Sequence, residues 1–285
     1  MERLLRRLEL ATLGPDRFSA DPGPGEGRLF GGLVAAQAVV AAGRTLGAGA
    51  AGRDARFLHS LHAYFLRPGT HESAIELEVD RIRDGRTFTT RRVVARQSGE
   101  AIFELAASFA RPEAGIEHQD PAPEAPEPEG LPDWEDLRAR LLGDPAQRRP
   151  DGPIEMRTCD PENPADPTAR LPARRRVWIR PRGGLPEDPL LHAAVLVYAS
   201  DRMLISTAAR PHGIPFGQRR GASLDHALWI HAPVRFDDWH LYASESPVAR
   251  AARGLVLGAI YSRRGERIAS VAQEGLIRTI RAGGA

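Results

Sequence analysis

The amino-acid sequence predicts an α+β protein made of two similar halves, each an antiparallel sheet wrapped around one helix. Three observations support this prediction. Each half starts with an apolar helical run, each continues with strands rich in Val, Ile, Phe and Thr, and a Pro- and Glu-rich segment separates the halves. Because one helix covers only one face of its sheet, the two units are expected to pair into a pseudo-dimeric core.

The first helical run is "FGGLVAAQAVVAAGRTL", residues 30–46, and it opens with Gly31 and Gly32. A dinucleotide fingerprint needs G-x-G-x-x-G and a P-loop needs a lysine, whereas this chain contains no lysine. The glycine pair therefore opens a helix whose first turn approaches something closely. Two roles stay open for it, which are packing against a neighbouring element and amide contact with a ligand.

Residues 111–136 alternate Pro, Glu and Ala, which is typical of an extended, solvated connection. This composition divides the chain into an N-terminal domain (1–112), a linker (113–170) and a C-terminal domain (171–285). The second half then repeats the order of the first. Its helical run is "PLLHAAVLVYASDRMLISTA", residues 189–208, and strands follow it.

The strand regions of the two halves indicate an internal duplication. "LHAYFLRPG" carries aromatic residues just before Pro68, and "HALWIHAPV" does the same before Pro233. A Gly-Glu turn leads into a later strand in each half, at Gly99, 31 residues after Pro68, and at Gly265, 32 residues after Pro233. Matched signals at matched spacing favour a repeat over two unrelated domains.

Composition excludes several functional classes. The single cysteine, Cys159, rules out an internal disulfide framework and leaves no zinc quartet to build. We expect neither a metal nor a cofactor. The pI of about 9.1 arises from arginine without interleaved aromatic residues, so no nucleic-acid partner is expected. No apolar run reaches the roughly 20 residues of a membrane span, and "MERLLRRLEL" lacks a secretory core, so the expected location is cytoplasmic.

Nine segments, in order and over nearly the whole length, resemble the acyl-CoA thioesterase II family, whose members carry two hotdog domains in one chain. The resemblance implies a tandem (double) hotdog fold, hydrolysis of an acyl-CoA substrate and a homo-oligomer, either a dimer or a tetramer. One departure is Leu33, where many members have glutamine. The nine segments are "RLFGGLVAAQA", "HSLHAYFLRPG", "DGRTFTTRRVVARQSGEAIF", "ASFARPEAGIEHQ", "RRRVWIR", "LVYASDRMLISTA", "ARPHGI", "SLDHALWIHAPVRFDDWHLYASESP" and "VAQEGLIR".

The resemblance assigns the chemistry to Asp201, Ser223 and Gln273. Asp201 would be the general base on a water that the Ser223 hydroxyl and the Gln273 amide also hold. Asp201 closes an apolar run, where an ionisable group is costly unless it is used or paired. From the pattern alone, Asp201 could equally end the run and face solvent, while the pattern favours Ser223 as a strand-edge hydroxyl and Gln273 as a strand residue that faces solvent. The first half has Ala107 at the position equivalent to Gln273, which predicts one such site per chain.

Other chemistries fit less well. "GASLD" does not match the nucleophile elbow G-x-S-x-G, which disfavours Ser223 as a nucleophile. Side-chain alternation along one strand would place Asp225 on the face of Ser223, as a candidate supporting group, and His226 on the opposite face. The adjacent Asp225 and His226 leave a hotdog hydratase or dehydratase as an alternative. A protein that binds acyl-CoA without hydrolysing it is another.

Substrate-binding residues are less defined by the sequence. Arginines can bind the phosphates of CoA, and the candidates are Arg180, Arg219, Arg220 and the run at 174–176, together with the amides of Gly31 and Gly32. In a chain without lysine, such arginines are also ordinary surface residues. His59 and His62 lie in a predicted strand and should face opposite ways, so they predict no metal site.

Overall fold

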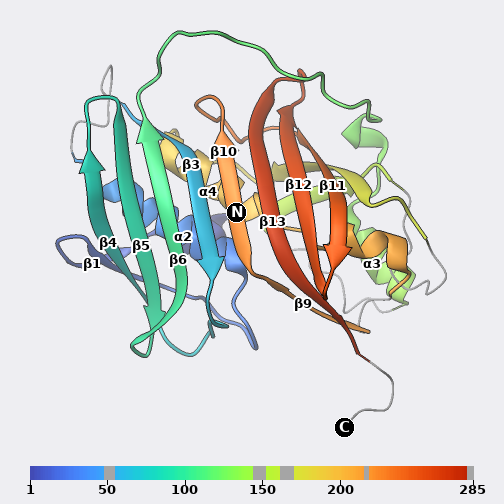
Figure 1. Ribbon diagram of the computed structural model, residues 1–285, viewed down its shortest axis with the longest axis horizontal. Coiled ribbons are helices and arrows are strands. Elements are labelled where there is room, and N and C mark those ends of the chain that lie inside the picture. The colour runs from blue at the N-terminus through green and yellow to red at the C-terminus, as the bar shows by residue number, and fades with distance from the viewer. Residues whose placement is uncertain (48–54, 144–151, 161–169, 215–217, 281–285) are drawn as a thin grey trace. The chain divides into compact units, whose positions relative to one another are not determined.

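The computed structural model describes residues 1–47, 55–143, 152–160, 170–214 and 218–280 (Figure 1). The chain divides into two compact units. Unit 1 comprises Met1–His118, Gly183–Arg202 and Asp225–Asp237, and unit 2 comprises Gln119–Arg182, Met203–Leu224 and Asp238–Ala285. The chain therefore passes from one unit to the other several times.

Unit 1 is an antiparallel sheet with helices. Its strands lie in the order β1-β2-β4-β5-β6-β3-β10 (Figure 1). The strands are β1 (Ala11–Gly14), β2 (Arg17–Ala20), β3 (Phe57–Phe65), β4 (Ile75–Asp84), β5 (Phe88–Gln97), β6 (Glu100–Ala110) and β10 (Asp225–Ile230). The helices are α1 (Glu2–Leu8), α2 (Gly31–Arg44) and α4 (Pro189–Ser200).

Helix α2 confirms the first predicted run and is buried from Gly32 to Ala42. It packs against strands β4, β5 and β6 on one side and against α4 on another. Its Gly and Ala residues permit this close approach, since a Cβ on Gly32 would lie 2.7 Å from the carbonyl oxygen of Tyr198 in α4. Small residues at a helix contact let the two backbones come together, so Gly32 has the packing role that the sequence left open.

Gln37 and Arg91 are two of the buried polar side chains in the core of unit 1. Gln37, in the middle of α2, is fully buried, and its Nε2 donates hydrogen bonds of 2.9 Å to the carbonyls of Arg7 and Asp21. Arg91, on β5, is 1% exposed, and its guanidinium donates to the hydroxyl and carbonyl of Thr45 and to the Asp84 carboxylate. Thr45 is the C-cap of α2, where a positive charge is favourable.

Unit 2 is also built on antiparallel strands. Their order is β13-β12-β11-β8-β7, and β9 pairs with β13 (Figure 1). The strands are β7 (Ile154–Thr158), β8 (Arg174–Pro181), β9 (Arg219–Ser223), β11 (His240–Arg250), β12 (Arg253–Ser262) and β13 (Arg267–Thr279). The helical segments are α3 (Trp134–Leu142), α5 (Ser206–Ala209), η2 (Pro128–Gly130) and η4 (Arg210–His212).

Part of the Pro- and Glu-rich segment packs on this sheet. Ala122, Ala125 and Leu131 contact a buried cluster that includes Trp178, whose indole Nε1 donates 2.8 Å to the carbonyl of Pro126. The expectation of a fully solvated connection is therefore wrong for this stretch. Proline leaves backbone carbonyls without a matching N–H, and here such a carbonyl accepts from a buried indole. We call residues 119–131 the strap.

The turns match the predicted duplication. Gly99 follows Ser98 between β5 and β6, and Gly265 lies between β12 and β13, with φ of +82° and +84°. Antiparallel strands and central helices confirm the predicted α+β class. The predicted domain bounds, 1–112, 113–170 and 171–285, follow the sequence repeat and stay a prediction. Within the described part of the chain, no helix is both long enough and apolar enough to cross a membrane.

Candidate active site

Asp201 stands at the C-terminal end of α4. The predicted run 189–208 is not one helix, because α4 ends at Ser200 and α5 starts only at Ser206. Met203, between the two, has φ of +63°, a left-handed conformation that ends regular helix. Asp201 is the C-cap residue of α4 and is partly exposed. The break therefore places an ionisable side chain at the end of an apolar helix.

The Asp201 carboxylate contacts the start of α2. Its Oδ2 accepts a hydrogen bond of 2.8 Å from the backbone N–H of Gly32. The first amides of a helix lack intrahelical acceptors and carry partial positive charge, so this position favours an ionised carboxylate. A Cβ on Gly31 would lie 3.1 Å from the same Oδ2 and 2.5 Å from Cε1 of Phe65. Gly31 and Gly32 both lack a side chain at this contact, where a Cβ on either would lie too close to a neighbouring atom.

Aromatic side chains surround this contact. The Phe30 and Tyr198 rings meet edge to face at 4.9 Å, and the Phe65 and Phe103 rings lie 5.2 Å apart. Burial raises the pKa of the Tyr198 phenol, although the nearby Arg202 opposes this shift. The phenol is therefore neutral at ordinary pH. An apolar wall beside a carboxylate suits an acyl group better than it suits a charged ligand.

A buried hydrogen bond lies next to Asp201 in the sequence. Ser200 is 0% exposed and His226, on β10, is 1% exposed. The Ser200 hydroxyl lies 2.9 Å from the carbonyl of Val197 and 2.9 Å from Nε2 of His226. Sequence reasoning did not select Ser200. Its only signal was that it immediately precedes Asp201.

Ser223 and Gln273 are neighbours in unit 2. Ser223 ends β9 opposite Gly275 of β13, and Gln273 lies two residues before Gly275 on the same strand. Residues two apart on a strand share a face, so Ser223 and Gln273 are diagonal neighbours on one face of the sheet. Gln273 is fully buried, which excludes the solvent-facing reading of this residue. Asp201 belongs to unit 1.

The strand expected to run through Ser223 and His226 is divided. β9 ends at Ser223, β10 begins at Asp225, and the two strands have different partners, β13 and β3. The alternation argument for this stretch is therefore wrong, because it assumed one continuous strand. Asp225 is paired in register with Tyr64 of β3.

The predicted CoA-binding arginines have different surroundings. Arg180 forms an ion pair with the buried Glu155, at 2.8 Å, and its guanidinium lies 4.3 Å from the ring centre of Trp239. These contacts engage its charged group, and its substrate role stays a prediction. Arg219 and Arg220 lie on β9, four and three residues before Ser223, with Arg220 exposed. Their substrate role stays a prediction.

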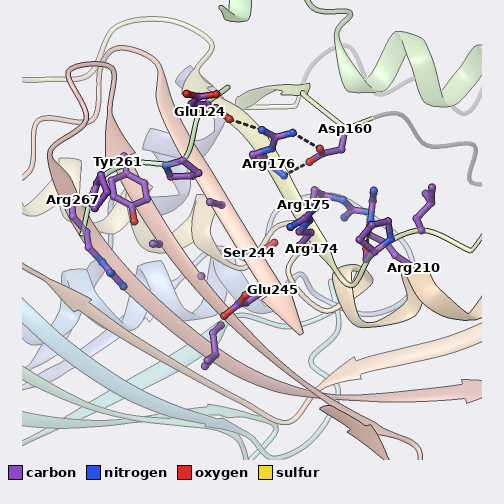
Figure 2. A pocket seen from close by; sticks show the side chains of 18 residues that line it. Glu124, Asp160, Arg174, Arg175, Arg176, Arg210, Ser244, Glu245, Tyr261 and Arg267 are labelled. Atoms are coloured by element: carbon purple, nitrogen blue, oxygen red, sulfur yellow. Dashed lines mark hydrogen bonds and ion pairs between the residues drawn. The ribbon is translucent and has the colours of Figure 1, made fainter. Parts of the chain in front are cut away.

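The arginine run at 174–176 lines a cavity of about 990 Å³ in unit 2 (Figure 2). Within it, Arg176 bonds to the strap carbonyl of Glu124 and forms an ion pair of 2.7 Å with Asp160. Arg175 donates to Ser206 and to the carbonyl of Met203. These arginines therefore fasten the strap and α5 to the sheet. Neither Ser223 nor Gln273 lines this cavity.

The two histidines of "HSLH" have separate partners. Nε2 of His59 lies 2.7 Å from the Ser108 hydroxyl, whereas the His62 ring meets the Trp229 ring edge to face at 5.2 Å. Burial lowers the pKa of His59. In the described ranges, no group of three or more His, Cys, Asp or Glu residues is placed to hold a metal ion.

Comparison with known proteins gives the family. The family profile described as acyl-CoA thioesterase matches residues 162–276, and the profile described as acyl-CoA thioesterase N-terminal domain matches residues 20–110. The chain is 38% identical over 268 residues to acyl-coenzyme A thioesterase 8 of Mus musculus, covering 90% of this chain and 82% of that protein. The chain belongs to the acyl-CoA thioesterase II family.

Solved structures agree with this assignment to the acyl-CoA thioesterase II family. A thioesterase II from Mycobacterium marinum superposes with a TM-score of 0.80 at 35% identity, covering 99% of each chain. A hot dog fold protein of unknown function from Alicyclobacillus acidocaldarius superposes with a TM-score of 0.78 at 17% identity, covering 98% of this chain and 99% of that one, which shows the fold alone. The predicted family and the tandem hotdog fold are confirmed, while the roles of Asp201, Ser223 and Gln273 stay predictions.

Proposed function

We propose that this protein hydrolyses acyl-CoA thioesters to a free carboxylic acid and CoA, by direct attack of water and without an acyl-enzyme. The observation that carries the proposal is the Asp201 carboxylate held at the N-terminus of α2 beside an apolar wall. Membership of the acyl-CoA thioesterase II family supports the reaction class.

In the proposed reaction, Asp201 accepts a proton from a water that Ser223 and Gln273 also hold. The water oxygen bonds to the acyl carbon, and the carbonyl electrons move onto its oxygen. The partial positive charge at the N-terminus of α2 stabilises this oxyanion. When the oxyanion collapses, the carbon–sulfur bond breaks, and the CoA thiolate takes the proton back from Asp201. The products are the acid and the CoA thiol, so atoms and charges balance.

The proposal includes acyl-CoA as the small-molecule partner and the aromatic residues around Gly31 as contacts for the acyl group. Its substrate-binding candidates are Gly31, Gly32, Arg180, Arg219 and Arg220. No cofactor or metal takes part in it. The expected dimer or tetramer and the cytoplasmic location stay predictions.

The test measures release of CoA thiol from straight-chain acyl-CoAs, from acetyl to palmitoyl, by the wild type and Asp201→Asn. Positioned base catalysis is worth about 10²- to 10⁴-fold, so kcat of Asp201→Asn should fall by that range. Asp188→Asn is the matched control, because Asp188 caps the other end of α4 by accepting from the Leu190 amide and Asn can cap equally well. Wild-type turnover by Asp201→Asn would disprove the assignment, and binding without turnover by the wild type would favour an acyl-CoA binding protein.

A further inference from the structure

A buried hydrogen bond of 2.9 Å links the Ser200 hydroxyl to Nε2 of His226. The Ser200 hydroxyl carries one hydrogen, and the carbonyl of Val197, 2.9 Å away, can only accept it. The same hydroxyl oxygen contacts both the helix carbonyl and the imidazole. An imidazole held this way has a fixed orientation within a buried site.

This bond joins the two stretches that carry proposed catalytic groups. Ser200 directly precedes Asp201, and His226 follows Ser223 by three residues. The bond ties the last turn of α4 to the start of β10, both within unit 1. Because Asp201 directly follows the last turn of α4 as its C-cap, a shift of that turn also shifts its carboxylate.

We propose that His226 and Ser200 are positioning residues, which hold the end of α4 so that the Asp201 carboxylate stays on the Gly32 amide in the geometry needed for base catalysis. The proposal rests on the proposed function. It gives His226 a role that differs from proton transfer to substrate, since its Nε2 is already engaged with Ser200. Small misplacements of a catalytic group cost up to about 100-fold in rate, so this role has a measurable effect.

A second buried histidine on the same helix provides the matched control. His192, in the first turn of α4, is 4% exposed, and its Nδ1 accepts a hydrogen bond of 3.0 Å from the Phe236 amide. Like His226, it is a buried imidazole with a hydrogen bond in unit 1. Unlike His226, it lies eight residues before Ser200. Removing either imidazole should lower stability, whereas only removal of His226 should disturb Asp201.

The experiment compares Ser200→Ala, His226→Leu, His226→Gln and His192→Leu in the full chain. Ser200→Ala and His226→Leu should lower kcat about 10- to 100-fold with KM changed less than about threefold, which is the signature of lost transition-state geometry. His226→Gln, whose amide can hydrogen-bond the Ser200 hydroxyl in place of Nε2, should recover most of kcat. His192→Leu should lower Tm but keep kcat. Wild-type kcat in a folded Ser200→Ala would overturn the proposal, and this variant removes too little volume to prevent folding.

A second readout does not depend on turnover. In a protein labelled with ¹⁵N-glycine, the Gly32 amide proton reports its hydrogen bond to the Asp201 carboxylate, and Asp201→Ala identifies the signal. Ser200→Ala and His226→Leu should move this signal in the direction of Asp201→Ala, and His192→Leu should leave it in place. An unmoved signal in Ser200→Ala would overturn the proposal. If the wild type hydrolyses no acyl-CoA, the proposed function fails, and the Gly32 signal still decides whether His226 positions Asp201.

Discussion

The backbone amide of Gly32 donates a hydrogen bond of 2.8 Å to Oδ2 of Asp201, across 169 residues of sequence. A backbone donor at a helix end has no rotamers to lose, so the helix itself fixes the carboxylate. The same glycine lies against the carbonyl of Tyr198, which brings α2 and α4 close enough for the bond to form. Helix packing and the geometry of the candidate base therefore depend on one residue.

Gly32→Ala should lower kcat at least tenfold and destabilise the fold by about 1–3 kcal/mol. The added Cβ would lie 2.7 Å from the Tyr198 carbonyl oxygen, a backbone atom, so α2 and α4 must move apart. Steady-state kinetics and urea unfolding measure the two effects. Gly14→Ala is the control, because nothing lies within 4 Å of a Cβ there. Wild-type kcat in Gly32→Ala would mean that the close approach does not matter for turnover.

Arg91→Ala should lower the free energy of unfolding by about 3 kcal/mol. The side chain is buried, and its loss leaves the Thr45 carbonyl at the end of α2 without its donor. Its neighbour Arg92 is 44% exposed in its side chain and pairs with Glu104 on the surface. Arg92→Ala should therefore change stability by less than about 1 kcal/mol. Equal losses for the two variants in denaturant unfolding would contradict this assignment.

Replacing the turn Ala251-Ala252 by Asn-Gly should stabilise the protein by about 1 kcal/mol. Both alanines have positive φ, +51° and +58°, in a two-residue hairpin between β11 and β12. Such turns favour Asn-Gly, because alanine is strained in the left-handed region. Thermal unfolding measures the gain. Ala249→Gly, in the adjoining strand, should destabilise, and a loss of Tm in the turn variant would rule out the strain argument.

Stability should fall in acid partly through Glu155. Burial alone would raise the pKa of this carboxyl, but hydrogen bonds from Arg157 and Arg180 outweigh burial and lower it below the ordinary 4.5. A lowered pKa contributes stability above pH 4.5 that is lost as the pH falls through the lower value. The stability difference between wild type and Glu155→Gln should therefore shrink from pH 6 to pH 3. The stability difference between wild type and Glu187→Gln, at an exposed residue, should stay small at every pH. A stability difference between wild type and Glu155→Gln that does not change with pH would contradict the argument.

Cys159 should react slowly with a chromogenic disulfide in the native protein and completely after denaturation. Burial raises the pKa of its thiol to about 11, and the nearby Asp160 adds to this. Since the thiolate is the reactive form, little is present at pH 8. A time course with and without denaturant measures the difference. Fast labelling of the native chain would show that the thiol is accessible and ionised.

The sequence predicted the elements whose signals are local. The apolar run with Gly31 and Gly32 is α2, and Gly99 and Gly265 occupy left-handed turns before strands. Ser223 and Gln273 could be paired only through the family resemblance, because their proximity comes from the β9–β13 register. Register between strands 50 residues apart is set by the whole sheet rather than by either segment.

Other features have no local signal. The polar, proline-rich composition of the strap predicts a solvated linker. In the structure, the Pro126 carbonyl and the strap alanines pack against the cluster around Trp178. In the sequence, His226 is adjacent to Asp225, which suggests an acidic–basic pair. In the structure, His226 forms a hydrogen bond with Ser200 of α4. In each case the deciding partner is distant in sequence, so composition and spacing could not identify it.

The alternation of the two units along the chain also limits how the protein can be divided. Residues 183–202 and 225–237 belong to unit 1 but lie in sequence between parts of unit 2. A fragment that ends at the strap would lack α4 and β10, and a fragment that begins after it would lack the cover over Trp178. Cutting the gene at the repeat boundary should therefore give two insoluble products, because each fragment would lack segments that complete its unit.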